Sequence, residues 1–291
     1  MHTPSFESGV HAERVRRADD GKAGRAISDY FDGLRVGAEA ITTSRAGFGM
    51  SAKIQRKRSR QTMELLMNDI STSHPRLTNS MLVCGAAGPA LFVVASLLDG
   101  AFRPGYSAWH HFTSELALGA GGWRQIANFL VCGVSVLCLA LGMRWTLRGG
   151  KGGASIPITF GVFGLSLILA GVFVTDPALG YPPSSTPTHS SAHGNIHNMA
   201  GLIMFSSLAV AAFLMANTLA ASPGWTAWPL YSRLTGLLVF AFFVISIVLA
   251  SMETSGSISN APVGLTQRVA IVCGWGWISL SAIRRLTLNR W

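Results

Sequence analysis

Long apolar segments alternate with shorter polar ones along most of the chain. Six of the apolar segments are 19 to 23 residues long, which is enough to cross a hydrocarbon core of roughly 30 Å. Because lipid offers no hydrogen-bond partner to a backbone, each segment is predicted to be an α-helix. The predicted spans are Ser80–Leu98, Ile126–Trp145, Ile156–Val174, His197–Leu219, Leu234–Met252 and Val263–Ile283.

The first quarter of the chain has the opposite character. Residues 1–77 hold 22 of the 36 Asp, Glu, Lys and Arg residues, and the rest of the chain is nearly free of charge. A soluble domain needs a surface that is roughly 25–35% charged. Residues 78–288 are therefore predicted to form an all-α integral membrane bundle of six transmembrane helices. Residues 1–77 are predicted to be a basic, largely disordered tail.

The distribution of basic residues predicts how the bundle is oriented. Lys and Arg gather in the tail, in the loops after the second and fourth spans, and at the C-terminus. The positive-inside rule therefore places both termini in the cytoplasm, and the long loops 99–125 and 175–196 outside the plasma membrane. This topology accounts for the net charge of +10, so we expect membrane lipid, and no nucleic acid, as the partner.

The ionisable residues after position 77 are unevenly placed. All four acids and all five histidines fall on the predicted outer side, and none of the ionisable residues lies near the middle of a span. Coupled transporters commonly carry such a group near the bilayer midplane. The pattern therefore disfavours a transporter and favours a site at the outer membrane interface. The acids and histidines are Asp99, Glu115, Asp176, Glu253, His110, His111, His189, His193 and His197.

The loop after the first span contains the first candidate group. If this loop is helical, His111, Ser114 and Glu115 share one face, because residues three and four apart are neighbours on a helix. We expect Glu115 to act as a general base and Ser114 to orient the reacting group. The structural alternative is that Ser114 and Glu115 only cap a helix, with the carboxylate near its positive end.

The second candidate group begins at the end of the third span. His193 and His197 are four residues apart, a spacing that suits two ligands of one metal ion if both lie on a helix. With Asp176 or His111 as a third ligand, a divalent metal ion is the candidate cofactor, and such an ion activates water at neutral pH. The alternatives are that Asp176 and Pro177 only end the span, and that the histidines are half-solvated interfacial groups.

Three groups of motifs in these regions occur together. They are Arg103-Pro104-Gly105-Tyr106 with Ser114-Glu115-Leu116-Ala117-Leu118-Gly119 and Gly122-Trp123, then Gly171-Val172-Phe173-Val174-Thr175-Asp176-Pro177, then His193-Gly194 with His197-Asn198-Met199-Ala200-Gly201. In this combination, the chain resembles the bacterial and archaeal membrane proteins of the family called domain of unknown function 998, over about residues 78–288. The resemblance implies a multi-pass membrane protein and names no reaction.

Two classes of function remain. One is an enzyme at the outer interface, a metal-assisted hydrolase or transferase that acts on lipid headgroups. The other is a non-catalytic sensor, lipid-binding protein or assembly protein. In that case the acids pair with an arginine such as Arg103, Arg124 or Arg268, and the pairs form a structural clasp that orders the outer loops.

Overall fold

The computed structural model describes residues 75–147, 152–183, 185, 190–219 and 227–288. All six predicted spans are α-helices, and each is long and apolar enough to cross a membrane. One 3-10 helix, η1 (Thr113–Ala117), lies between the first two α-helices, and the described residues contain no β-strand. The α-helices are α2 (Pro75–Phe102), α3 (Trp123–Thr146), α4 (Ser155–Val172), α5 (Ala192–Leu219), α6 (Trp228–Thr254) and α7 (Val263–Leu288).

Several helices extend beyond the apolar segments that predicted them. Helix α2 begins at Pro75, so the last three residues of the predicted tail are helical, and the remainder of that tail lies outside the described residues. Helix α5 begins at Ala192, which brings His193 and His197 onto one helix. The added turns are more polar than the spans because helix ends reach the headgroup region, where apolar composition no longer marks a helix.

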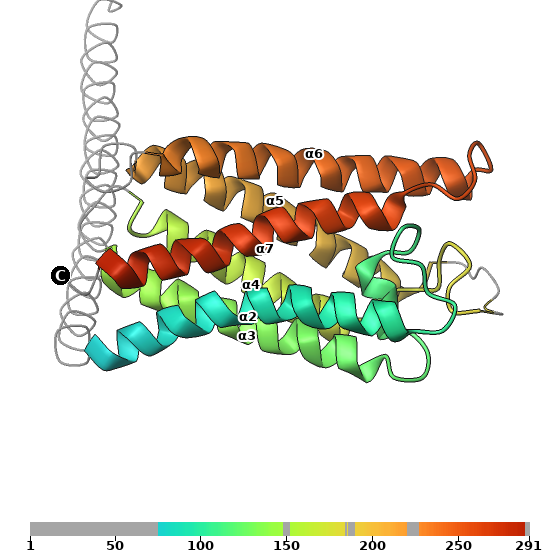
Figure 1. Cartoon of the computed structure of the whole chain (residues 1–291), viewed down its shortest axis with the longest axis horizontal. Helices are drawn as coiled ribbons and strands as arrows, with labels where there is room; N and C mark the ends of the chain where they lie inside the picture. Colours follow the sequence, from blue (N-terminus) through green and yellow to red (C-terminus); the bar gives the residue numbers. More distant parts are fainter. Residues whose placement is uncertain (1–74, 148–151, 184, 186–189, 220–226, 289–291) are drawn as a thin grey trace, which may run out of the picture. The chain divides into compact units, whose positions relative to one another are not determined.

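The six helices form a ring of neighbours. Each packs against the next helix in the sequence, and α7 closes the ring against α2. The connections after α2, α4 and α6 lie together at one end of the bundle (Figure 1). We call this the long-loop end and define it by residues 103–122, 173–183 and 255–262.

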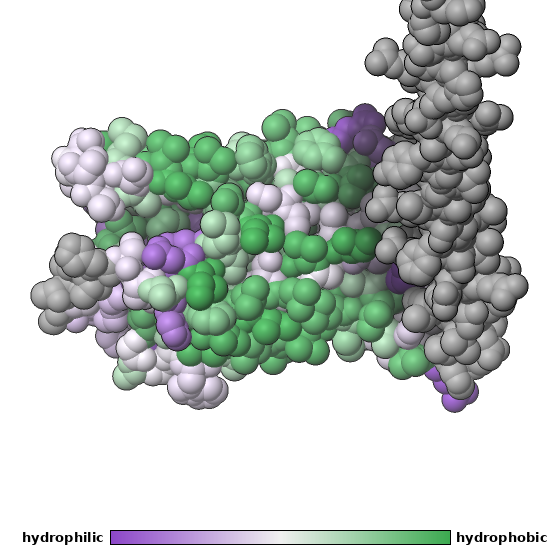
Figure 2. Space-filling view, turned by 180° about the vertical axis from the view of Figure 1, so that it is seen from behind, coloured by the Kyte–Doolittle hydropathy of each residue, from purple (hydrophilic) through white to green (hydrophobic). Residues whose placement is uncertain are grey.

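The outer surface of the bundle is apolar along the middle of the helices. Leu237, Leu91 and Leu165 are 59%, 58% and 55% exposed. On the face that Figure 2 shows, hydrophobic residues dominate the middle of the bundle and hydrophilic residues gather toward its ends. A continuous apolar surface of this extent is unfavourable in water, so the surrounding solvent is lipid and the chain is a multi-pass membrane protein.

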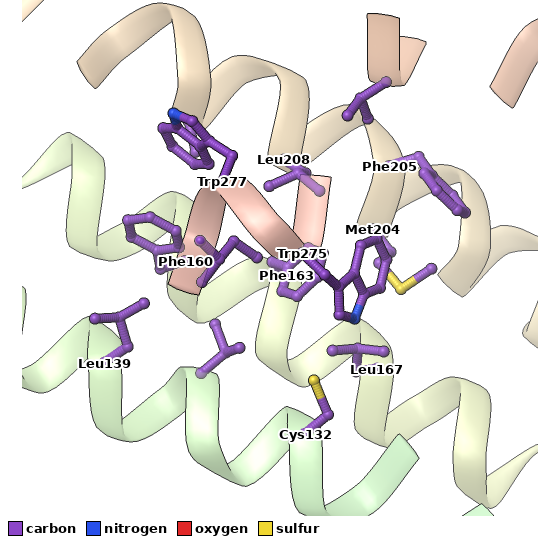
Figure 3. Packing of buried hydrophobic residues seen from close by; sticks show 14 of the residues in the cluster. Cys132, Leu139, Phe160, Phe163, Leu167, Met204, Phe205, Leu208, Trp275 and Trp277 are labelled. Carbon is purple, nitrogen blue, oxygen red and sulfur yellow. The ribbon is translucent and has the colours of Figure 1, made fainter. Parts of the chain in front are cut away.

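Trp275 of α7 occupies the centre of the core. Its ring centroid lies 4.9 Å from that of Phe163, 5.5 Å from that of Phe92 and 5.7 Å from that of Phe205. These partners come from α4, α2 and α5, and Figure 3 shows the indole between Phe163 and Phe205. Aromatic pairs at such distances stabilise packing beyond the area that they bury, so one side chain fixes the spacing of four helices.

Candidate functional site

Arg103 ties the loop after α2 to the end of that helix. Its guanidinium forms a 2.7 Å ion pair with Asp99, which also lies 3.2 Å from Arg124. The same group donates hydrogen bonds to three loop carbonyls, those of Leu116, Ala120 and Gly121. A guanidinium carries five N–H donors, so one buried arginine can hold several carbonyls at once. A structural clasp of the kind expected for these arginines is therefore present.

A second arginine, Arg268 of α7, holds the first half of the same loop. It donates to the Tyr106 hydroxyl and to three carbonyls, those of Ala108, His111 and Gly264. A Cβ at Gly264 would lie 2.3 Å from the His111 oxygen, so only glycine lets α7 approach the loop this closely. Burial raises the pKa of Tyr106 to about 12, so its hydroxyl keeps its proton.

The two clasps seat η1 on the long-loop end and bury Glu115, which is only 1% exposed. Its Oε2 accepts a 2.6 Å hydrogen bond from the N–H of Phe112, so the carboxyl group caps η1, as in the structural alternative. Its Oε1 is buried and has no hydrogen-bond partner within the described residues. Glu115 therefore serves the fold through Oε2, and its other oxygen is sealed inside the protein near the backbone of Ala178.

Burial also controls the charge of Glu115. It raises the pKa of the carboxyl group from 4.5 to about 8, although the backbone of Phe112 and Ala178 and the charge of Arg268 favour the ionised form. A carboxyl group with this pKa is mostly protonated at neutral pH. The general-base role expected for Glu115 needs the ionised form, which prevails only above about pH 8.

His197, in the second turn of α5, is also buried and only 6% exposed. Its Nδ1 lies 2.9 Å from two carbonyl oxygens at the end of α4, those of Ala170 and Phe173. Because carbonyl oxygens only accept hydrogen bonds, Nδ1 carries the hydrogen and Nε2 carries a lone pair. Nε2 makes no hydrogen bond to any residue that the structure describes.

Asp176 fastens the loop after α4 to the start of α5. Its two oxygens accept hydrogen bonds from the hydroxyl and the backbone N–H of Ser191, at 2.6 and 2.8 Å. The Ser191 hydroxyl in turn accepts the N–H of Gly194 and caps α5. The hydrogen bonds from Ser191 lower the pKa of Asp176, so this carboxylate is ionised at neutral pH.

A cavity of about 830 Å³ extends from η1 into the bundle. Its wall at the long-loop end is polar, and its wall inside the bundle is apolar. Polar lining residues are Thr113, Ser114, Glu115, Asp176, His197 and Asn198. Apolar lining residues are Phe92, Phe129, Met204, Phe205, Phe243 and Trp275, of which Met204, Phe205 and Trp275 are seen in Figure 3.

One side of the cavity faces the lipid surface of the bundle. Met199 and Leu202 of α5 and Ile247 of α6 line the cavity and are 56%, 46% and 45% exposed. In Figure 1, α5 diverges from α6 toward the long-loop end. Residues that both line a cavity and lie exposed on an apolar flank mark an opening toward lipid, here between α5 and α6.

The structure brings four of the six predicted site residues to this cavity. Ser114, Glu115, Asp176 and His197 line it, and they come from η1, from the loop after α4 and from α5.

His111 and His193 do not line this cavity. His111 accepts the N–H of Ser107 at Nδ1 and hydrogen-bonds the carbonyl oxygen of Leu179 through Nε2. Burial is the main reason why its pKa is lowered. His193 is exposed, and its ring lies against Phe173. Of the three histidines predicted to form one site, only His197 therefore lines the cavity.

The predicted metal site is not assembled in the described part of the chain. Across 75–147, 152–183, 185, 190–219 and 227–288, no group of three or more His, Cys, Asp or Glu residues is placed to hold a metal ion. His189 lies outside these ranges. Metal binding by His193, His197 and His111 stays a prediction.

Three residues that matter for the cavity were not predicted from the sequence. Thr113 is 2% exposed and its hydroxyl has no hydrogen-bond partner among the described residues. Gln267 accepts the backbone N–H of Thr113 at 2.8 Å, and Trp275 forms part of the apolar wall. A polar Gln267-Arg268 pair at the start of an otherwise apolar span was the available signal for Gln267, whereas Thr113 and Trp275 had none.

The chain belongs to the family described as a protein of unknown function, DUF998, whose sequence profile matches residues 86–284. This match confirms the family resemblance seen in the loop motifs. The matched region contains every residue of the cavity named above. Neither the curated proteins nor the solved structures gave a match.

The contact between Asp176 and α5 predicts that Gly194→Ala destabilises the protein. An added Cβ would lie 2.1 Å from the Asp176 carboxylate, and relieving such overlap costs about 1–3 kcal/mol. Thermal unfolding of the purified protein in detergent measures the loss. Gly201→Ala on the same helix is the control, because no heavy atom lies within 4 Å of its added Cβ. Equal melting temperatures for both variants would contradict the role of Asp176.

The raised pKa of Glu115 predicts that stability falls as the pH rises between 4.5 and about 8. In this window the folded state holds a proton that the unfolded state has released, so each pH unit costs about 1.4 kcal/mol. Glu115→Gln removes this contribution, and its melting temperature is expected to change less between pH 6 and pH 8. The same pH dependence in both proteins would show that Glu115 is ionised when folded.

Proposed function

We propose that this protein binds a membrane lipid, with the headgroup at the polar wall of the cavity and the acyl chain against the apolar wall. One observation carries the proposal: a single cavity runs from Glu115 and His197 to Trp275 and opens between α5 and α6 toward lipid. Its volume of about 830 Å³ falls in the range of ligand sites, roughly 300–1,000 Å³.

The two walls favour an amphiphile over a water-soluble ligand. Aromatic and methionine side chains, Phe205, Met204 and Trp275 among them, offer the inner end of the cavity almost no hydrogen bonds. Burying a polar ligand group there without a partner costs several kcal/mol, about 2–7. The exposed Met199, Leu202 and Ile247 let a ligand arrive from the bilayer with its apolar part still in an apolar medium.

The orientation predicted from the basic residues completes this proposal. It places the long-loop end on the outer side of the plasma membrane and both termini in the cytoplasm. The lipid would then come from the outer leaflet. A protein of this kind acts as a lipid sensor or carrier when it does no chemistry, which corresponds to the non-catalytic class inferred from the sequence.

Filling the cavity tests lipid binding directly. Gly201 lines the cavity and has open space around its Cβ position, so Gly201→Leu is expected to fold normally and to occupy space that the ligand needs. We expect at least a roughly tenfold loss of bound lipid, equivalent to about 1.4 kcal/mol, when purified protein is examined by native mass spectrometry.

Gly161→Leu on α4 is the matched control, because Gly161 also has open space around its Cβ position and does not line the cavity. Lipid binding is expected to persist in this variant. If wild-type protein, Gly161→Leu and Gly201→Leu retain the same lipid, the cavity is not where that lipid binds.

The second candidate function is the hydrolase or transferase predicted from the sequence. It is favoured by the free Nε2 of His197, a residue that lines the same cavity as Glu115. Nε2 would take the proton of an attacking water or alcohol, and the protonated carboxyl group of Glu115 would give its proton to the leaving oxygen. The roles differ from those expected earlier, because His197 replaces Glu115 as the base.

His197→Asn separates catalysis from binding. The Asn amide can still donate to the carbonyls of Ala170 and Phe173 but offers no basic nitrogen. Turnover of total lipid extract in nanodiscs, followed by mass spectrometry, is expected to fall by roughly 100-fold or more, and His193→Asn, an exposed change on the same helix, is expected to leave it intact. If the wild-type protein forms no product, or if His197→Asn remains active, the catalytic candidate is excluded.

A further inference from the structure

A second cavity, of about 400 Å³, lies between the end of α2 and the start of α3. Figure 1 shows these helices side by side, joined by the loop that holds η1. The second cavity shares no lining residue with the first, and its volume falls in the range of ligand sites, roughly 300–1,000 Å³. We call it the α2–α3 cavity.

Arg124 lines the α2–α3 cavity and keeps unused hydrogen-bond donors. Its side chain is 53% exposed, and its Nε lies 3.2 Å from Asp99 and donates to the Gly121 oxygen at 3.4 Å. Its two terminal nitrogens make no hydrogen bond to any residue that the structure describes. Each of these nitrogens carries two N–H groups, so Arg124 can bind a phosphate while Nε stays beside Asp99.

The charges around the α2–α3 cavity do not cancel. Asp99 is the one carboxylate among the lining residues, and it lies between Arg103 at 2.7 Å and Arg124 at 3.2 Å. One carboxylate and two guanidinium groups leave a net charge of +1. Because Arg103 is buried and bonded to loop carbonyls, the excess charge is exposed at Arg124. An anion beside Arg124 would complete this set of charges.

Apolar side chains surround the charged part of the α2–α3 cavity. Phe102, Trp123 and Leu98 line it and are 83%, 69% and 55% exposed. Leu91, which is 58% exposed, lies further along the same face of α2, because residues seven apart return to one face of a helix. From Phe102 to Leu91 the helix rises about 16 Å, roughly half of a 30 Å hydrocarbon core. This strip is long enough to contact one acyl chain.

We propose that the α2–α3 cavity binds an anionic phospholipid, with its phosphate at Arg124 and one acyl chain along α2. The predicted spans end at Leu98 and begin again at Ile126, so Arg124 and Trp123 lie at the boundary between hydrocarbon and headgroups, where both residue types are favoured. A zwitterionic headgroup brings its own ammonium, which would find no free carboxylate because Asp99 already pairs with two arginines. This site is independent of the first cavity, and either assignment can fail alone.

Two brominated phospholipids that differ only in the headgroup test the inference. Phosphatidylglycerol and phosphatidylcholine, each brominated near the carbonyl end of one acyl chain, are titrated into phosphatidylcholine nanodiscs that hold the full-length protein. Subtracting the fluorescence of Trp123→Phe isolates the quenching of Trp123. One arginine at a membrane surface favours an anionic lipid about fivefold. We therefore expect phosphatidylglycerol to quench Trp123 at a mole fraction about fivefold lower than phosphatidylcholine does.

Variants of Arg124 test its role in this preference. Arg124→Gln removes the charge, so the two lipids are expected to quench Trp123 equally. Arg144→Gln, in the last turn of the same helix, is the matched control and is expected to keep the preference. If Arg124→Gln fails to fold, Arg124→Lys replaces it. This variant keeps a cation beside Asp99 but loses the planar fork of donors, and it is expected to lower the preference by roughly twofold or more.

Three results would overturn the inference. They are equal quenching of Trp123 by both lipids in the wild-type protein, an unchanged preference in the folded Arg124 variant, and an equal loss of preference in Arg144→Gln. If an excess of inorganic phosphate abolishes the preference, the site takes a free anion and the lipid assignment is wrong. Gly201→Leu, which fills the first cavity, is expected to leave the preference intact, so the two lipid sites are judged separately.

Discussion

The two buried arginines at the long-loop end hold the loop on which the cavity depends. A loop folded back onto an apolar bundle carries backbone carbonyls that must find donors. Arg103 donates to three loop carbonyls and Arg268 to two, those of Ala108 and His111. Because these bonds press η1 against the helix ends, Glu115 becomes buried, its carboxyl group becomes protonated at neutral pH, and the cavity acquires a polar wall. Without the clasps, the same loop would lie in water and Glu115 would be an ordinary surface carboxylate.

Two residues that line the cavity, Glu115 and His197, also hold the fold together. Glu115 caps η1 through Oε2, and His197 holds the end of α4 through Nδ1. Both residues line the cavity, and the second ring nitrogen of His197, Nε2, finds no partner in the described chain. Fixing one atom of a side chain also fixes the direction and protonation of the other. This preorganisation is what a binding site requires, because a ligand then meets groups that need no reorientation.

The charge pattern of the sequence predicted at which end of the bundle the site lies, but not which residues line it. The acids and histidines were expected at one end of the bundle, and Glu115, Asp176 and His197 do lie around one cavity there. The spacing of four residues also grouped His193 with His197. In the structure, the His193 side chain is exposed, whereas the His197 side chain is buried against the end of α4. Asp176 was a candidate for chemistry, yet both of its oxygens are bound by Ser191, a residue that no pattern connected with it.

The sequence by itself determined the six helices, their approximate ends, the long-loop end and the family, because lipid solvation imposes length and apolarity on each span independently of its neighbours. Tertiary structure alone decided the rest. The central position of Trp275, the burial of Glu115, the free nitrogen of His197 and the opening between α5 and α6 all depend on contacts between helices. A lipid-facing residue and a core-facing residue are equally apolar in a membrane protein, so hydropathy could not distinguish the wall of a cavity from the surface of the bundle.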